Sequence, residues 1–311
     1  MSHLMYESYE KWKIVKTSLG YEIKTILPYL NNFLAYCTDK FPEYESTTKE
    51  MVDSWLLVKT FKTKGTQMNA ISAIRNFATF CNSIGIQSFV PDEDYTIKID
   101  PYTPYIFSEK ELRILFETID SFEEKKSSPK REYILPVYFR MLYCCGMRPG
   151  EPNRLKIEDV NLETGEIYII QSKRKRDRHL IMSEDLRQLC IAYNCIAGKR
   201  TYFFERNNKP ITKDWIRRQF RGAWKRSGLY KDCFPRPYDL RHCFATRTMM
   251  RWIDKKQDVM ELLPYLSTYM GHKKYTHTLY YVHLLPERLL KSAGIDWKSL
   301  ERVYEKETDN D

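Results

Sequence analysis

The stretch Gly146-Met-Arg-Pro-Gly-Glu151 opens a series of four short segments that decide how this chain is interpreted. The other three are Tyr238-Asp-Leu-Arg-His242, Met270-Gly-His272 and the pair Tyr280-Tyr281, and a strongly basic run, Ser172-Lys-Arg-Lys-Arg-Asp-Arg178, follows the first. Taken singly, each segment is weak. An arginine at a helix end is usually a cap or faces solvent, a basic hairpin tip is usually solvated, and a tyrosine pair on an apolar helix is usually core. The information therefore lies in their order and spacing.

The elements expected around these segments are mostly helices. An apolar helix from about Tyr133 should end at Gly146. The apolar runs at residues 166–170 and 180–182 flank the basic run, which indicates a β-hairpin with a basic tip. Further helices are expected around residues 184–196, 213–226, 239–252, 257–270 and 275–283, and the tail from Pro286 has an amphipathic helical pattern.

The first hundred residues predict a small helical bundle. Apolar residues recur at steps of three and four from Tyr21 to Cys37, where Pro28 should kink the helix or shift its start. Thr47 is followed three residues later by a glutamate, which is the spacing of a capping box that opens a second helix. A third helix, with its apolar face between Met68 and Cys81, should stop near Gly85.

Residues 86–107 contain three prolines and an acidic run but no sustained apolar period, so they are the best candidate for a linker. Ser108 with Glu111 then forms a new capping box. We therefore predict a helical domain over residues 1–104 and a mixed domain over residues 105–311. The expected fold class is mainly α with a small β-sheet.

Composition excludes several classes of protein. The chain has 311 residues, enough for about two domains, and no apolar stretch approaches the roughly 20 residues of a membrane span. Its start is charged, without the apolar segment of a secretory signal, so a cytoplasmic location is expected. Eight cysteines form no C-x-x-C pair, which favours reduced thiols. No phosphate-binding glycine loop and no metal-ligand spacing occur, so no cofactor or metal is expected.

The charge is unevenly distributed. The net charge of the chain is +10, and residues 1–100 carry −1 while residues 101–311 carry +11. A phosphate-bearing partner is the first hypothesis, and an ordinary solvated basic surface is the alternative. The predicted helix 213–226 should bury its apolar face and turn its arginines outward, where they could grip phosphates or contact guanines. A weaker basic segment, residues 59–64 with Arg75, would either follow a DNA backbone or be a solvated face.

In this order the segments resemble the tyrosine recombinase family, the integrases of phages and mobile elements. The family's first box, Gly-x-Arg-x-x-Glu, matches residues 146–151. Its hairpin lysine, followed by polar residues, an arginine and an apolar strand, matches Lys173 to Leu180. The second box, usually His-x-Leu-Arg-His, is present with Tyr238 in the place of the first histidine. The family's Leu-Gly-His, followed nine residues later by the nucleophilic tyrosine, corresponds to Met270-Gly-His272 and Tyr281.

The resemblance implies a role for each of these positions. Arg148 and Arg241 would offer planar forks to the non-bridging oxygens of a phosphodiester, whose negative charge grows at the transition state. Tyr281 would attack the phosphorus, and Lys173 would protonate the leaving 5′ oxygen, with Lys175 as the competing candidate. His272 would hydrogen-bond a phosphate oxygen or the nucleophile.

Some positions leave a choice. Tyrosine is a poor base near neutrality, so Tyr238 would only hydrogen-bond the phosphate. Tyr280 adjoins Tyr281, so either could be the nucleophile. Two features favour Tyr281: the nine-residue interval from His272 and the Val-His that follows it. Glu151 would orient Arg148, and His242 would support the second box.

The resemblance further implies a helical core-binding domain and a catalytic domain that clamp double-stranded DNA, with cleavage and rejoining through a 3′-phosphotyrosyl intermediate. It implies a homotetramer on two synapsed sites, helped by DNA-bending accessory proteins. Two rival interpretations are a type IB topoisomerase, which relaxes supercoils as a monomer, and a DNA-binding regulator that has lost catalysis; a metal-dependent nuclease ranks below both. The tail from Pro286 would dock either on the next protomer or on its own domain.

Overall fold

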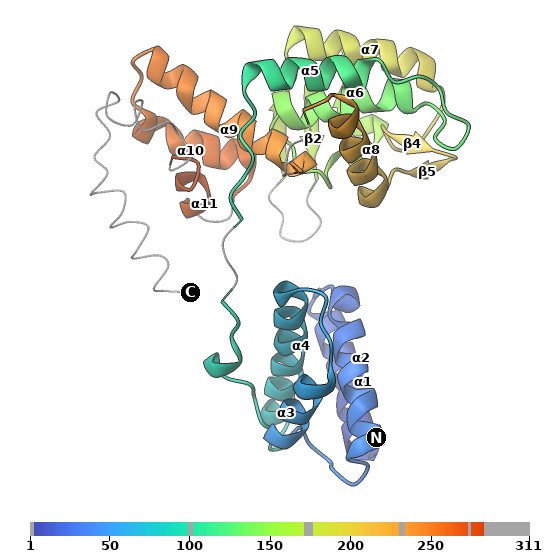
Figure 1. Ribbon diagram of the computed structural model, residues 1–311, viewed down its shortest axis with the longest axis vertical. Helices are drawn as coiled ribbons and strands as arrows, with labels where there is room; N and C mark the ends of the chain where they lie inside the picture. Colours follow the sequence, from blue (N-terminus) through green and yellow to red (C-terminus); the bar gives the residue numbers. More distant parts are fainter. Residues whose placement is uncertain (1–2, 99–101, 171–176, 230–233, 273–274, 283–311) are drawn as a thin grey trace. The chain divides into compact units, whose positions relative to one another are not determined.

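The computed structural model describes residues 3–98, 102–170, 177–229, 234–272 and 275–282. The chain divides into two compact units, Met1–Tyr102 and Thr103–Asp311 (Figure 1). Among the described residues, no helix combines the length and the apolar character that a membrane crossing requires. The tail from Pro286 lies outside the described residues.

The first unit is a bundle of four α-helices around an aromatic core. Its core contains Trp12, Phe33, Trp55 and Phe77, each at most 2% exposed, with the rings of Phe33 and Trp55 meeting edge to face. These residues come from four different helices, so each helix contributes one large ring to the shared core. The elements are α1 (His3–Ser18), η1 (Ile23–Thr25), α2 (Leu27–Lys40), α3 (Lys49–Val58), α4 (Lys64–Ser83) and η2 (Glu93–Tyr95).

Two helix starts in this unit differ in detail from the sequence patterns. Pro28 lies in the first turn of α2, so the proline shifts the start of the helix rather than kinking it. The cap of α3 is Thr48 and not Thr47: the Thr48 hydroxyl accepts the Met51 N–H at 3.3 Å. Thr47 is buried instead, and its carbonyl accepts the Phe89 N–H at 2.7 Å. This hydrogen bond holds the segment after α4 against the first unit.

The predicted linker is shorter than residues 86–107. Its first part folds back on the first unit, where Phe89 and Tyr95 pack against the core. Arg75 on α4 donates to the carbonyls of Pro91 and Asp92 at 2.6 and 2.8 Å. Arg75 therefore has a structural role that the sequence did not indicate, and its contact with a DNA backbone stays a prediction.

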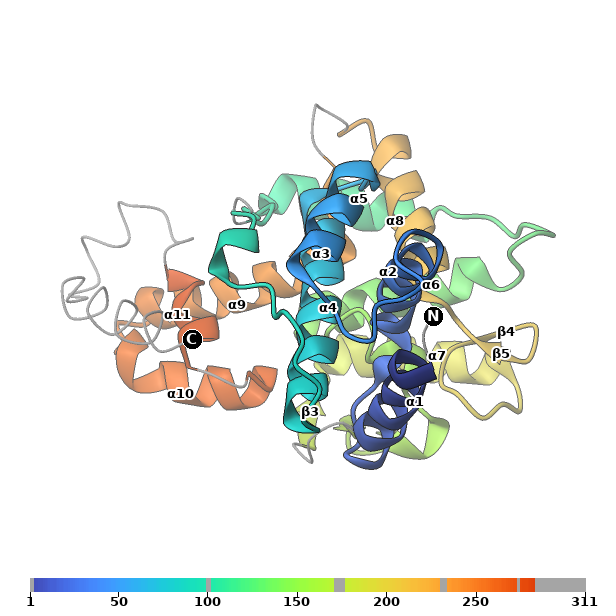
Figure 2. The same ribbon diagram turned by 90° about the horizontal axis from the view of Figure 1, so that it is seen from below.

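The second unit is mostly helical with two small sheets. Helix α6 is its central helix and contacts α5, α7 and α9. Figure 2 shows α10 and α11 side by side at one end of this unit, with β4 and β5 at the other. The helices are α5 (Glu109–Asp120), α6 (Arg131–Cys144), α7 (Glu184–Ala197), α8 (Lys213–Arg226), α9 (Pro237–Asp254), α10 (Val259–Met270) and α11 (Thr276–Leu279), with short 3-10 turns η3 (Pro152–Arg154) and η4 (Ile157–Asp159).

The predicted hairpin is confirmed. Strands β2 (Glu166–Ile169) and β3 (Arg178–Ile181) pair antiparallel with Ile169 opposite Arg178. Three two-residue strands were not predicted: β1 (Val160–Asn161) pairs with β2, and β4 (Glu205–Arg206) pairs with β5 (Lys209–Pro210). Strands this short carry no alternation of apolar and polar residues, so a sequence pattern cannot find them.

Three other predictions about helices have different outcomes. The capping box of Ser108 and Glu111 is present at α5, and α8 buries its apolar positions while its arginines face outward, as predicted. The helix predicted over residues 275–283 is wrong in length, because α11 ends at Leu279. The Tyr281 N–H bonds the carbonyl of Thr278 at 3.0 Å, a tighter spacing than an α-helix has, and the tyrosine side chain is buried. The fold class, mainly α with a small sheet, is confirmed.

Candidate active site

A tight turn that follows α6 positions Arg148 in the site. Gly146 has a φ of 60°, and a Cβ atom at this position would overlap the ring of Phe244 on α9. Only glycine fits this turn, because the left-handed backbone and the close approach of α9 both exclude a side chain. The Glu151 N–H then bonds the carbonyl of Arg148 at 2.8 Å, which closes the turn.

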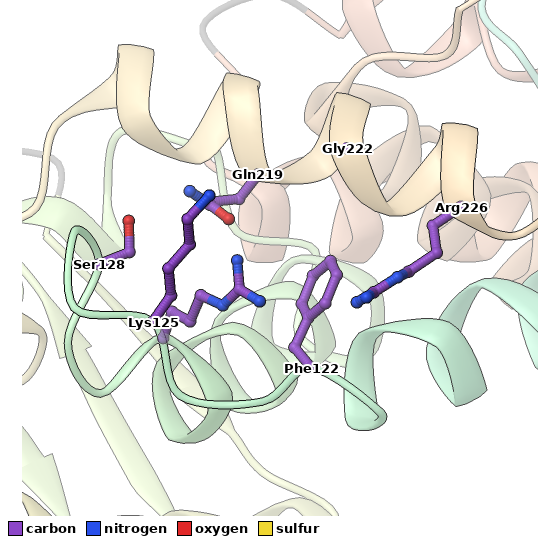
Figure 3. Close-up of a pocket in the computed structure, with 7 residues that line it drawn as sticks. Phe122, Lys125, Ser128, Gln219, Gly222 and Arg226 are labelled. Carbon is purple, nitrogen blue, oxygen red and sulfur yellow. The ribbon is translucent and has the colours of Figure 1, made fainter.

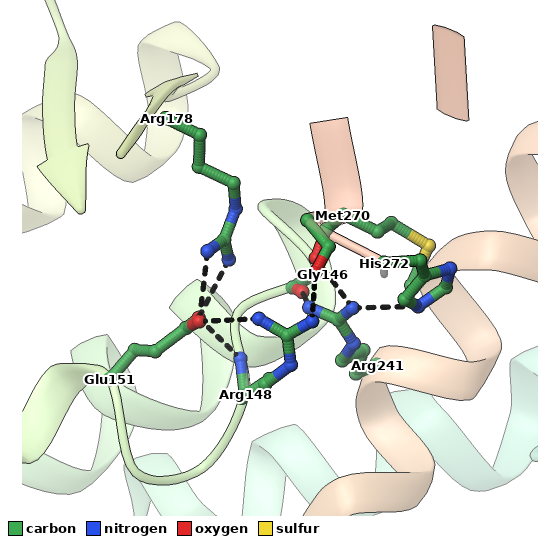
Figure 4. Close-up of polar contacts among 8 residues, drawn as sticks. Gly146, Arg148, Glu151, Arg178, Arg241, Met270 and His272 are labelled. Atoms are coloured by element: carbon green, nitrogen blue, oxygen red, sulfur yellow. Dashed lines mark hydrogen bonds and ion pairs between the residues drawn. The ribbon is translucent and has the colours of Figure 1, made fainter. Parts of the chain in front are cut away.

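The carboxylate of Glu151 is shared by two arginines (Figure 4). It accepts the Arg148 backbone N–H at 2.7 Å and the Arg148 Nη1 at 3.0 Å. Arg178, the first residue of β3, donates to both oxygens in a fork, from Nη1 to Oε1 at 2.9 Å and from Nη2 to Oε2 at 2.7 Å. Glu151 thus orients Arg148, as the sequence predicted, but a second arginine helps to hold it in place.

Arg241 lies in the second turn of α9 and is fully buried. Its guanidinium donates to the carbonyl of Gly146 at 2.5 Å, to that of Met270 at 2.7 Å and to Nε2 of His272 at 2.9 Å (Figure 4). Arg148 donates from Nη2 to the carbonyl of Gly271. The carbonyls of two consecutive residues at the end of α10 therefore hold the two arginines beside each other.

His272 is held at both ring nitrogens. Nδ1 lies 2.7 Å from the hydroxyl of Thr278, and Nε2 lies 2.9 Å from Arg241. A guanidinium can only donate, so Nε2 accepts and the proton of the neutral ring resides on Nδ1. Burial, followed by the charges of Arg241 and Arg148, lowers the pKa of His272 to about 3. The imidazole is therefore neutral at physiological pH.

Tyr281 is 2% exposed and lies against two imidazole rings. Its ring stacks on His272, with 5.9 Å between centroids and 20° between planes, and lies 5.3 Å from the ring of His242. Burial raises the pKa of Tyr281 to about 12, while the positive charge of Arg241 acts in the opposite direction. The phenol is thus protonated, and it lies beside the cation that can stabilise its anion.

Tyr238 and His242 lie on one face of α9, a helical turn apart, with 4.9 Å between ring centroids. His242 lies between Tyr238 and Tyr281, because it contacts both rings. Burial and the charges of Arg236 and Arg241 lower the pKa of His242 to about 4, so this ring is also neutral. His242 supports the second box, as expected, by packing against the tyrosine of the site.

The structure brings most of the predicted site residues into one place, whereas their chemical roles stay predictions. Lys173 and its rival Lys175 lie outside the described residues. Sequence reasoning missed Arg178 as a buried ion-pair partner and Thr278 as the partner of His272. Among the described residues, no three His, Cys, Asp or Glu side chains are grouped as a metal site requires. The residues found together are Arg148, Arg241, His272, Tyr281 and Tyr238.

Because the pKa values of His272 and His242 are lowered in the folded protein, we expect the protein to lose stability in acid. Their pKa values fall from 6.5 to about 3 for His272 and about 4 for His242 on folding, so the unfolded chain binds more protons between these values. The free energy of unfolding should therefore decrease as the pH falls below about 6.5, by at most about 1.4 kcal/mol per pH unit for each histidine. Denaturant unfolding at a series of pH values measures this slope. His242→Gln cannot titrate and should flatten it; an unchanged slope would contradict the assignment.

Comparison with known proteins agrees with this arrangement. The model of the phage integrase family matches residues 106–288, which is more than half of the chain. The protein y4rB of Sinorhizobium fredii is 31% identical over 223 residues, covering 66% of this chain and 68% of its own. Tyrosine recombinase XerC of Staphylococcus epidermidis is 26% identical over 231 residues, covering 71% of each chain.

Solved structures show the same fold. The XerH site-specific recombinase bound to its difH substrate aligns with a TM-score of 0.62 at 21% identity, covering 94% of this chain and 84% of the other. A lambda integrase fragment bound to a core site aligns with a TM-score of 0.60 at 17% identity, covering 89% and 94%. Together with the family match and the ordered site residues, these likenesses lead to one conclusion: the chain belongs to the phage integrase family, the tyrosine recombinases.

Proposed function

We propose that this chain is a site-specific recombinase that cleaves and rejoins double-stranded DNA through a covalent 3′-phosphotyrosine bond, without a metal ion or ATP. The observation that supports the proposal is the arrangement of Tyr281, His272 and Arg241. The tyrosine ring stacks on the imidazole, the imidazole accepts a hydrogen bond from Arg241, and Arg148 is held next to Arg241. A buried phenol beside two guanidiniums suits nucleophilic attack on a phosphodiester.

The two arginines would supply the charge that the reaction needs. A phosphodiester carries one negative charge and gains more as the phosphorus becomes pentacoordinate, and fixed donors stabilise that charge without reorganising. In the free protein Nη1 of Arg148 donates to the carboxylate of Glu151, whereas Nη2 of Arg148 and both Nη atoms of Arg241 donate to neutral acceptors. Phosphate oxygens accept stronger, charge-assisted hydrogen bonds than carbonyls do, so bound DNA would take over these donors.

The chemical step is a transfer of the phosphoryl group. The Oη atom of Tyr281 bonds to the phosphorus, the bond from phosphorus to O5′ breaks, and the phenol proton passes to solvent water. Lys173 gives a proton to O5′, and rejoining is the reverse. Once phosphate takes the donors of Arg241, Nε2 of His272 is free to carry a proton and donate to the phosphate. The hydroxyl of Thr278 permits this change, because it can either accept from Nδ1 or donate to it.

A basic surface beside α8 is the proposed contact with the DNA backbone. The exposed cations of this helix are Lys213, Arg217, Arg218, Arg221, Lys225 and Arg226. A pocket of about 370 Å³ separates α8 from the turn between α5 and α6, and Figure 3 shows Lys125 and Ser128 on that turn facing Gln219 and Arg226 on α8. The lining residues are Phe122, Lys125, Ser128, Arg131, Gln219, Gly222 and Arg226, three cations without a carboxylate. Such a pocket suits a phosphate.

Salt dependence tests this contact. Each phosphate contact releases counterions, so Arg226→Gln should weaken binding to any duplex and lower the slope of log affinity against log salt concentration by about 1. Fluorescence anisotropy with a labelled duplex at several salt concentrations measures the slope. Arg113→Gln, which removes an exposed arginine from α5, is the matched control and should leave the slope unchanged. Equal slopes for both variants would remove Arg226 from the interface.

The proposal extends to the whole chain. The helical residues 1–104 would form the core-binding domain, residues 105–311 the catalytic domain, and the two would clamp the duplex. Four chains would act together on two synapsed sites, with DNA-bending proteins as accessory partners. The XerH and lambda integrase chains that this fold resembles were each solved on DNA, which supports the clamp.

A trapping assay tests the function. Wild-type protein is incubated in EDTA with a nicked suicide duplex that carries the end of its own element, and the products are run on a denaturing gel. The expected product is a protein–DNA adduct that protease removes. Cleavage that requires a divalent metal, or that leaves no adduct, would contradict the proposal. A supercoiled plasmid without the site should stay supercoiled, since relaxation would favour a type IB topoisomerase.

A further inference from the structure

Arg178 makes an ion pair that is unusual for its burial. The side chains of Arg178 and Glu151 are 6% and 4% exposed, and both guanidinium Nη atoms bond the carboxylate, at 2.9 and 2.7 Å. Buried charged pairs of this kind are costly to desolvate, so they contribute little net free energy to folding. A bidentate pair nevertheless fixes the orientation of the carboxylate plane, because both oxygens are held in one geometry.

The charges of this group are unequal. Arg148, Arg178 and Arg241 bring three positive charges close to the single carboxylate of Glu151. Burial alone raises the pKa of Glu151, but hydrogen bonds and charge from Arg178, followed by Arg148 and Arg241, outweigh it and keep the pKa below its ordinary value. Arg178 thus supplies the main counter-charge for Glu151. Arg148 also pairs with Glu151 through Nη1 at 3.0 Å, so its Nη2, which bonds the neutral carbonyl of Gly271, is the donor that a phosphate could take.

Arg178 also lies where three segments of the site meet. It begins β3, five residues after Lys173 in sequence, and it bonds Glu151 in the turn of Arg148. It also lies against Gly271, where an added Cβ would meet Arg178 Cδ at 3.2 Å and Arg178 Nη1 at 3.3 Å. Gly271 directly precedes His272, and its carbonyl accepts from Arg148.

We propose that Arg178 is a positioning residue for DNA cleavage: by its fork to Glu151 and its contact with Gly271, it holds the turns of Arg148 and His272 and the start of β3 in one arrangement. This inference rests on the proposed function. Arg178 acts through Glu151 and does not itself contact the phosphate. The sequence analysis matches Arg178 to the arginine that follows the hairpin lysine in the family's pattern, but it assigns this arginine no role.

Single-turnover cleavage of the suicide duplex, measured from about pH 5 to about pH 8, tests the role. The variants are Arg178→Met, Glu151→Gln and the double variant. The matched control is Arg140→Met, which removes another bidentate pair of the same unit, from Arg140 to Asp120 at 2.7 and 2.6 Å. Arg178→Met should slow adduct formation roughly 10- to 100-fold, because a displaced Arg148 no longer meets the phosphate. The control should stay near the wild-type rate.

The pH profile separates positioning from a merely structural role. In Arg178→Met the buried Glu151 loses its main counter-charge, its pKa rises, and the rate relative to wild type should fall further as the pH is lowered. The double variant should lose this dependence, since glutamine does not titrate, and should be no slower than Glu151→Gln alone. If Arg178→Met does not fold, Arg178→Lys takes its place: it should keep the flat profile but remain slower than wild type.

Three results would overturn the proposal: Arg178→Met or its lysine replacement cleaving at the wild-type rate, Arg178→Met slowed with an unchanged pH profile, or the two single effects multiplying in the double variant. These outcomes are distinct from failure of the proposed function, in which the wild-type protein itself forms no adduct in EDTA.

Discussion

Replacing Tyr281 with phenylalanine should reduce covalent capture of the suicide duplex to background, while Tyr280→Phe should still form the adduct. The change removes one oxygen atom, so the ring can still stack on His272 and pack beside His242. Loss of a nucleophile that forms the covalent intermediate removes the reaction path itself, and such losses reach about 10⁶-fold in rate. Gel quantification of the adduct after a fixed time, with both proteins at equal DNA occupancy, measures the effect.

Tyr280 is the matched control because it is the neighbouring residue and undergoes the same chemical change. It is only partly buried, and its ring lies 6.1 Å from that of Tyr281. An adduct from Tyr281→Phe together with none from Tyr280→Phe would reverse the assignment of the nucleophile. Loss of the adduct in both variants would show that the turn, rather than one phenol, has been disturbed.

Arg241→Lys should slow adduct formation by about 10²- to 10³-fold, with a much smaller effect on DNA affinity. A lysine has its three donors on a single nitrogen, whereas the planar guanidinium of Arg241 reaches two carbonyls and His272 from two nitrogens in a fixed fork. The lost donors act on charge that develops in the transition state, so the rate falls more than binding does. Single-turnover cleavage and anisotropy, measured on the same duplex, separate the two quantities.

The control for this change is Arg247→Lys, the same substitution on the same helix. Arg247 is partly exposed and pairs with Glu109 at 2.8 Å, so its replacement should leave the cleavage rate near that of wild type. Arg241→Lys should also lower the free energy of unfolding by about 1–3 kcal/mol, because buried carbonyls lose a donor. A variant that cleaves at the wild-type rate would remove Arg241 from the proposed chemistry.

Most of the helices could be predicted from sequence because their apolar faces repeat at the helical period. The amphipathic pattern of α8 and the capping box of α5 are local signals, and both are confirmed. Thr47 and Thr48 are chemically identical, so only the tertiary bond from Phe89 to Thr47 decides which of them caps α3. The two-residue strands and the return of residues 86–97 to the first unit depend on contacts that no local pattern contains.

The site was predictable to a different degree. The order of the boxes identified Arg148, Arg241, His272 and Tyr281, and the structure brings them together. Spacing could not show that Arg178 is buried, because a buried arginine needs acceptors that the fold places around it, and for Arg178 the acceptor is a carboxylate. That carboxylate is Glu151, 27 residues away in sequence and on another segment.

The central claim is that Tyr281 becomes linked to the 3′ phosphate of the cleaved strand, and mapping the adduct tests it most directly. The trapped wild-type complex is digested with protease and nuclease, and the modified peptide is sequenced by mass spectrometry. We expect one nucleotide attached through its 3′ phosphate to the phenolic oxygen of Tyr281, formed in EDTA. A nucleotide on Tyr280 or Tyr238, or one attached through its 5′ phosphate, would contradict it.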